Sequence, residues 1–198
     1  MGFDLKLMIS NFLNVIQQIS PLTQKEKDLL SDALIVRHIP KKFNLVEIGK
    51  ISRETYFINK GCLQLFYNKD GEDATIFLAT ENMFLGAFTS FLTQRASLEG
   101  IRALEDCELL VLPKSALDKL YETMPKMNLI IRKIMEQRFL SAQSIVASFV
   151  LNKPEERYLQ MLSQRPELFQ RVPQHILATF LGITPVSLSR IRKRILEG

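Results

Sequence analysis

Hydrophobic residues in this 198-residue chain recur with a helical period at both ends and alternate with polar residues in between. The segment 5–34 predicts two helices, LKLMISNFLNVIQQI and TQKEKDLLSDAL, with a break at Ser20, Pro21 and Leu22. Thr23 followed by Glu26 has the spacing of a capping box, which predicts where the second helix begins.

From Ile35 to Pro113, apolar and polar residues alternate in short runs. The runs are VRHIP, NLVEI, TYFIN, CLQLFYN, ATIFLA, GIRALE and CELLVLP. They are separated by turn residues such as Gly49, Gly61 and the pair Asp70-Gly71. Many short strands at this spacing predict an antiparallel barrel or jelly roll.

After Pro113 the helical period returns, with a short helix at 114–122 and a long one at 126–151. A heptad seam follows the long helix through Ile131, Met135, Arg138, Ala142, Ile145 and Phe149. If this seam were the only apolar face of the helix, it could pack on the chain's own β-roll, and no second subunit would be needed. A second apolar face is formed by Ile130, Ile134, Phe139, Val146 and Val150. Because both faces must be covered, we expect one to pack on the roll and the other on a second subunit.

The helix should end at Asn152, Lys153 and Pro154, a hinge and domain boundary.

The last quarter of the chain predicts a helix at 155–163 and then two short amphipathic helices broken at Gly182. The apolar faces of these two helices consist of Leu177, Ala178 and Leu181 in the first, and Leu188, Ile191 and Ile195 in the second. Thr184 is suited to the N-cap of the second helix and Pro185 to its first turn. The remaining face consists of Pro185, Val186, Ser189, Arg190 and Lys193. Hydroxyl and guanidinium groups are what base edges and phosphates require.

Charge supports nucleic-acid binding over the alternative that two helices and a glycine belong to an ordinary all-α domain. Residues 151–198 contain eight basic and four acidic side chains, a net charge of +4 out of +5 for the whole chain. The basic excess is concentrated on the last helix, as in a nucleic-acid-binding surface.

The string Ala178, Leu181, Gly182, Ile183, Thr184, Ser187, Leu188, Ser189, Arg190 resembles the recognition element of the Crp/Fnr superfamily of bacterial transcription regulators. The segment ETYFINKGCLQLFYNKDGEDATIFLA resembles the ligand-sensing β-roll of the same superfamily.

The resemblance implies an α+β chain with three parts: an antiparallel, jelly-roll-like sensor at 1–125, a dimerisation helix and hinge at 126–152, and a helix-turn-helix domain at 153–198. It also implies a homodimer that binds double-stranded DNA with a two-fold operator, and RNA polymerase as a further partner. The expected DNA-binding residues are Thr184, Val186, Ser187, Ser189, Arg190, Arg192, Lys193 and Arg194.

The expected effector site departs from the cyclic-nucleotide binders of this superfamily. In those proteins a Gly-Glu pair holds the ribose, and an Arg followed by Ser or Thr holds the cyclic phosphate. Here Gly86 is followed by Ala87, and Ser97 stands ten residues later, with Arg95 two residues early. Losing a charge-assisted contact costs about 1.5 to 3 kcal/mol per hydrogen bond, so we do not expect cyclic AMP to bind. The pocket candidates are Phe84, Gly86, Ala87, Phe88, Arg95 and Ser97, either around another small-molecule effector or, with Phe91 and Leu92, as filling of the roll.

Other chemistry is weakly represented. Cys62 and Cys107 stand in apolar runs, so we expect them to be reduced core residues. Some members of the superfamily hold an iron-sulfur cluster through four cysteines, which one copy of this chain cannot supply. His38 and His175 have no neighbouring ligand pattern, so no metal site or other cofactor is expected. No apolar run reaches the length of a membrane span, and the N-terminus lacks the features of a cleavable signal, so we expect a cytoplasmic protein.

Three hypotheses remain: a dimeric transcription regulator, an effector-binding or protein-interaction module without specific DNA recognition, and an enzyme on a cupin-like roll. The enzyme is the weakest, because the sequence shows no paired catalytic carboxylates, metal cluster or nucleophile with a base.

Overall fold

The computed structural model describes residues 2–197, and within them the side chains of residues 5–195. Two helices open the chain, α1 (Gly2–Ile19) and α2 (Gln24–Asp32). The predicted capping box is present at α2, where the Thr23 hydroxyl accepts from the Glu26 N–H and the Glu26 carboxylate accepts from the Thr23 N–H. The two predicted N-terminal helices are thus confirmed.

Within residues 2–197, eight strands form two four-stranded antiparallel sheets, in the orders β1-β8-β3-β6 and β2-β7-β4-β5. The strands are β1 (Ile35–Ile39), β2 (Asn44–Val46), β3 (Glu54–Lys60), β4 (Leu63–Lys69), β5 (Glu72–Ala79), β6 (Phe84–Leu85), β7 (Glu99–Ala103) and β8 (Cys107–Pro113). Asp70 and Gly71 both have positive φ in the two-residue turn that joins β4 to β5. All seven predicted runs are strands; the short β6 and the helix α3 (Phe88–Thr93) were not predicted.

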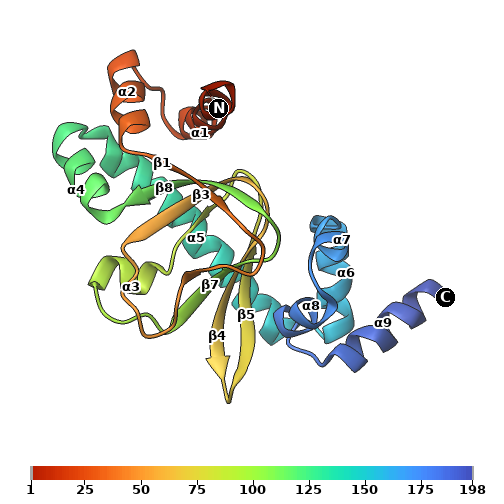
Figure 1. The fold of residues 1–198 in the computed structure, drawn as a ribbon. Coiled ribbons are helices and arrows are strands. Elements are labelled where there is room, and N and C mark those ends of the chain that lie inside the picture. Colours follow the sequence, from red (N-terminus) through yellow and green to blue (C-terminus); the bar gives the residue numbers. More distant parts are fainter. Residues whose placement is uncertain (1, 198) are drawn as a thin grey trace.

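Two hydrophobic clusters hold this β-roll together. The first lies between the sheets and includes Tyr56, Ile58, Ile101 and Leu109. The second covers the outer face of the first sheet with α1, α4 (Lys114–Thr123) and the start of α5 (Lys126–Leu151), as Figure 1 shows. At 26 residues α5 is about 39 Å long, so it extends well past the roll.

The C-terminal part, which we call the head, consists of α6 (Pro154–Gln164), α7 (Leu168–Arg171), α8 (Gln174–Phe180) and α9 (Pro185–Glu197). It lies beside the roll, blue in Figure 1, with α8 against β5. A third cluster joins Cys62, Leu78 and Leu104 of the roll to the apolar faces of all four head helices. The α+β fold class is confirmed, and the head rests on its own roll through a shared core.

Candidate DNA-binding and effector sites

The turn between α8 and α9 is fixed by backbone geometry. The Ile183 N–H donates to the Ala178 carbonyl and the Gly182 N–H to the Thr179 carbonyl, both at 3.0 Å, which is a Schellman ending. Gly182 has φ +68°, and a Cβ added there would lie 2.5 Å from the Phe149 ring of α5. Glycine is therefore required twice, for its conformation and for the close approach of α5.

Helix α9 buries one face and exposes the other. Leu188 and Ile191 are buried in the head core. The Thr184 hydroxyl accepts from the Ser187 N–H at 3.2 Å and lies 3.0 Å from the Ser187 hydroxyl, which fixes the start of the helix.

Among the predicted DNA-binding side chains, Thr184, Val186, Ser189, Arg190, Lys193 and Arg194 are exposed, and Ser187 and Arg192 are partly buried. Arg194 pairs with Glu155 of α6 at 2.7 Å. The exposed face of α9 thus presents a hydroxyl, an apolar side chain and several cations together.

Arg157 of α6 is a structural residue that the sequence did not indicate. Its Nε and Nη2 donate to the Leu181 carbonyl at 3.1 and 2.9 Å, and its Nη1 donates to the Asn152 carbonyl at 2.7 Å. The guanidinium also stacks over the Phe149 ring, 4.7 Å from its centroid. One side chain therefore ties the helix-turn-helix turn to the end of α5.

Two arginines of the head bind the roll. Arg171 donates to both carboxylate oxygens of Glu81, at 2.8 and 2.7 Å, and also contacts Glu105. Arg165 donates to the Leu78 carbonyl at 2.6 Å and to the Thr80 hydroxyl at 3.0 Å. We call these contacts the head clamp. Sequence patterns carry no signal for them, because the partners are 66 to 90 residues apart.

Burial alone would raise the pKa of Glu81, but hydrogen bonds outweigh it. The donors are Arg171 and the backbone N–H groups of Glu81 and Gly61, and together they hold the pKa at about 2. The same hydrogen bonds, with those to Glu105, raise the pKa of Arg171. Glu81 and Arg171 are therefore both ionised at neutral pH.

The loop residues predicted for the effector site are arranged with few free polar groups. Gly86 and Ala87 are buried, and Phe84 and Phe88 are partly buried. The Ser97 hydroxyl donates to the Glu99 carbonyl at 2.8 Å and accepts from the Glu99 N–H at 3.1 Å. The Arg95 side chain is exposed, at the far end of the α3 loop. The loop thus presents neither a carboxylate at Ala87 nor an inward guanidinium.

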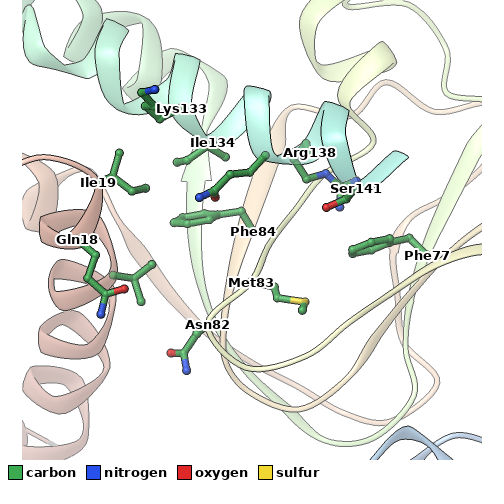
Figure 2. Close-up of a pocket in the computed structure, with 12 residues that line it drawn as sticks. Gln18, Ile19, Phe77, Asn82, Met83, Phe84, Lys133, Ile134, Arg138 and Ser141 are labelled. Atoms are coloured by element: carbon green, nitrogen blue, oxygen red, sulfur yellow. The ribbon is translucent and has the colours of Figure 1, made fainter. Parts of the chain in front are cut away.

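An open pocket of about 460 Å³ lies beside this loop, between α1 and α5. Figure 2 shows Gln18 and Ile19 reaching it from α1, and Lys133, Ile134 and Arg138 from α5. Its remaining lining includes Phe77, Asn82, Met83 and Phe84 from the roll. Among the predicted effector residues, Phe84 alone lines it.

The two halves of the predicted seam on α5 differ in their surroundings. Ile131 and Met135 pack against the chain's own second cluster, and Arg138 stacks on Phe77. Ala142 is exposed and Ile145 partly buried, whereas Phe149 is 44% exposed and contacts Gly182. The strongly exposed apolar side chains of this half are Phe139, Leu140, Val146, Val150 and Leu151.

Cys62 and Cys107 are free and buried, in agreement with their reading as core residues. Burial raises the pKa of the Cys62 thiol to about 12 and that of Cys107 to about 11. Neither thiol is poised to react as a thiolate.

The chain combines a β-roll, one long helix and a helix-turn-helix head. Residues 36–124 match the family model of the cyclic nucleotide-binding domain. Residues 36–124 are therefore similar to this domain family, and the chain has the fold of solved Crp/Fnr regulators, as the sequence predicted.

Particular relatives agree with this assignment. The anaerobic regulatory protein of Bacillus subtilis (strain 168) is 29% identical over 111 residues, which cover 55% of this chain and 47% of that protein. The match thus spans about half the length of this curated relative. The c-di-GMP responsive global regulator CLP of Xanthomonas campestris has a TM-score of 0.71 at 18% identity, covering 88% of this chain and 92% of that one. A member of the Crp/Fnr family from Eubacterium rectale has a TM-score of 0.70 at 17% identity, covering 89% of this chain and 85% of that one.

Within the described residues, no helix is long and apolar enough to cross a membrane.

Proposed function

We propose that this protein is a homodimeric, DNA-binding transcription regulator of the Crp/Fnr type. The observation that carries the proposal is the exposed face of α9. Arg190 and Ser189 are exposed there, while Leu188 and Ile191 are buried in the core of the head. The helix is therefore held by its apolar face and presents its polar face to solvent. A helix held in this way can enter the major groove with its N-terminal side chains toward the bases.

Within this proposal, the side chains of α9 have different roles. Arg190 is placed to donate two hydrogen bonds to guanine O6 and N7, with Ser189 and Val186 beside neighbouring bases. Val186 is 60% exposed, and its methyl groups suit a thymine methyl. Lys193, Arg192 and Arg194 contact the DNA phosphates. Arg194 would give up its surface ion pair with Glu155 to do so, which costs little free energy.

Dimerisation through the second half of α5 is the other part of the proposal. Phe139, Leu140, Val146, Val150 and Leu151 are 57 to 77% exposed on one protruding helix. Such a contiguous apolar surface favours a partner, and a second copy of α5 presents the same surface. The dimer seam then consists of these residues together with Ala142 and Ile145. In such a dimer the two heads would bind operator half-sites about 34 Å apart.

We also infer that the loop has lost cyclic-nucleotide binding, since Ala87 has no carboxylate and the Ser97 hydroxyl is already used within the loop. The effector, if it is anionic, must be held elsewhere.

Binding-site selection from a random DNA pool tests the proposal. We expect an inverted repeat. Arg190→Ala should cost about 1 to 3 kcal/mol per half-site on the selected operator and little on random DNA. Lys193→Ala should weaken binding to both DNAs and make the salt dependence shallower by about one unit per subunit.

Arg95→Ala is the matched control, because Arg95 is an exposed arginine outside the head. It should leave affinity and selected sequence unchanged. An interaction module would show almost no salt-dependent DNA affinity, and an Arg190→Ala variant that selects the same sequence would refute the assignment of α9.

A further inference from the structure

The turn between β5 and β6, residues 80–83, contacts both the N-terminal helix α1 and the head. Thr80 and Glu81 accept hydrogen bonds from the two arginines of the head clamp. The next residue, Asn82, accepts from the Asn11 side chain of α1, with 3.0 Å between Nδ2 and Oδ1. Figure 2 shows Asn82 in this turn. Two elements at opposite ends of the chain are therefore joined to adjacent residues of one short turn.

Asn82 has a backbone conformation that needs support. Its φ is +65°, in the left-handed region that side chains disfavour, although asparagine tolerates it better than most residues. Its N–H donates to the Ile58 carbonyl at 2.8 Å, and its side chain is held by Asn11. Because Glu81 and Asn82 share a peptide group, a turn that relaxes at Asn82 also moves the Glu81 carboxylate.

The position of Asn11 is set by the packing of α1 rather than by the turn. Its side chain also donates to the Asn59 side chain of β3 at 3.2 Å. The neighbouring Phe12 is buried and packs edge-on against Phe57, with 5.3 Å between ring centroids, and against Phe84 at 6.1 Å. Helix α1 is thus a fixed support from which Asn11 holds the turn.

The position of Glu81 in turn determines the geometry of the head clamp. Its Oε1 accepts from the Gly61 N–H at 2.8 Å and from Arg171 at 2.7 Å, and its Oε2 accepts from Arg171 at 2.8 Å. A pair in which one guanidinium donates to both carboxylate oxygens requires both oxygens in place. A small displacement of the turn therefore weakens the contact between roll and head.

We propose that α1 stabilises the docked position of the head through residues 80–83, so that displacement of α1 releases the head from the roll. The route runs through Asn11, Asn82, Glu81 and Arg171. Such a coupling is reciprocal, so release of the head also loosens α1. The inference concerns the position of the head on its own roll and does not depend on the proposed DNA binding.

The reactivity of the Cys62 thiol measures release of the head. Cys62 is fully buried in the third cluster, which the roll shares with the head. Burial raises the pKa of its thiol to about 12, and the charges of Arg171 and Arg165 oppose that rise, so the thiol lies near the head clamp. The chain has two cysteines, so Cys107→Ala leaves Cys62 as the only thiol. Its rate of labelling by N-ethylmaleimide then follows the population of the open form, provided that opening and closing are faster than labelling.

In this background, Asn11→Ala should raise the Cys62 labelling rate about 3- to 10-fold, the change in open population expected for one lost hydrogen bond. Asn14→Ala is the matched control, because Asn14 is exposed on the same helix, and it should leave the rate unchanged. Asn82→Gly keeps the left-handed conformation but removes the acceptor. It should reproduce the rise even if Asn11→Ala fails to fold.

Two comparisons separate this route from a general loosening of the chain. In a Cys62→Ala background, Cys107 lies in the first cluster, between the sheets, and should be labelled at the same rate with or without Asn11→Ala. In an Arg171→Gln background, the labelling of Cys62 is already faster and should rise no further when Asn11 is replaced.

Three results would overturn the proposal. Equal Cys62 labelling rates in Asn11→Ala and Asn14→Ala would show that α1 does not act on the head. Equal rises at Cys62 and Cys107 would show that the whole chain is loosened. A rise from Asn11→Ala that multiplies the rise from Arg171→Gln would show that α1 acts by a route outside the head clamp.

Discussion

The head clamp makes a quantitative prediction about stability. Replacing Arg171 with Gln removes both hydrogen bonds to Glu81 and those to Glu105, and leaves two carboxylates near one another without a cation. A charge-assisted hydrogen bond contributes about 1.5 to 3 kcal/mol, and surface pairs much less. The Arg171, Glu81 and Glu105 side chains are 25 to 34% exposed, so solvent screens the clamp in part. We therefore expect Arg171→Gln to lower the free energy of unfolding by about 2 to 3 kcal/mol.

Urea denaturation followed by circular dichroism suits this measurement, because the chain has no tryptophan for fluorescence. Arg194→Gln provides the control. It breaks a single pair with Glu155 in which the arginine is 65% exposed, and should change the free energy of unfolding by less than about 0.5 kcal/mol. Arg171→Gln, Glu81→Gln and the double variant then form a cycle whose coupling energy isolates the direct pair.

The pH dependence gives an independent check. The pKa of Glu81 falls from its ordinary 4.5 to about 2 on folding, so its contribution is present above pH 4.5 and is lost as the pH falls toward 2. The stability difference between the natural chain and Arg171→Gln should be full at pH 7 and shrink across this window. A variant as stable as the natural chain at pH 7, or a difference that stays constant down to pH 3, would refute the clamp.

Three further predictions follow from the hinge, the exposed helix and the loop. Gly182→Ala should destabilise the chain by more than Gly71→Ala, for which we expect only the roughly 1 kcal/mol of positive-φ strain. A Cβ at Gly71 meets open space, whereas one at Gly182 meets the Phe149 ring. Equal melting temperatures of the two variants would contradict this. Leu140→Asp, at a side chain 66% exposed, should convert a dimer into a folded monomer in sedimentation velocity, and a natural chain that is already monomeric at high concentration would exclude the α5 interface. Cyclic AMP should leave the melting temperature and DNA affinity unchanged, and saturable micromolar binding in calorimetry would disprove the loss of the loop contacts.

Local signals in the sequence were sufficient for most of the fold. Thr23 and Glu26 marked the start of α2, Asp70 and Gly71 marked the β4–β5 turn, and the residues before Pro154 marked the end of α5. These features depend on backbone preferences within a few residues, so they can be read without tertiary structure. β6 was missed because it has two residues and its pairing with β3 is a long-range contact.

The sites were less predictable because their residues meet only in the folded chain. The heptad pattern placed Arg138 on the same seam as Ile145, but a repeat of 3.5 residues does not state whether the roll or a partner covers each turn. In the structure the roll covers the first turns, so Arg138 stacks on Phe77 while Leu140 remains exposed. Charge at a heptad position was the available signal, since an arginine in an apolar seam requires a partner of its own.

Phe149 shows why the hinge could not be read from the pattern either. As an apolar heptad residue it counts toward the dimer seam, yet its ring lies over Gly182 and beneath the Arg157 guanidinium. Arg157 in turn holds the carbonyls of Asn152 and Leu181, which belong to the hinge and to the turn before α9. Any rotation of the head relative to α5 must therefore break the contact of Arg157 with the Asn152 carbonyl and separate the Phe149 ring from Gly182, whereas the contact with Leu181 lies within the head. One arginine and one ring therefore make a compact contact between α5 and the head, which holds α9 in place together with the head clamp and the third cluster.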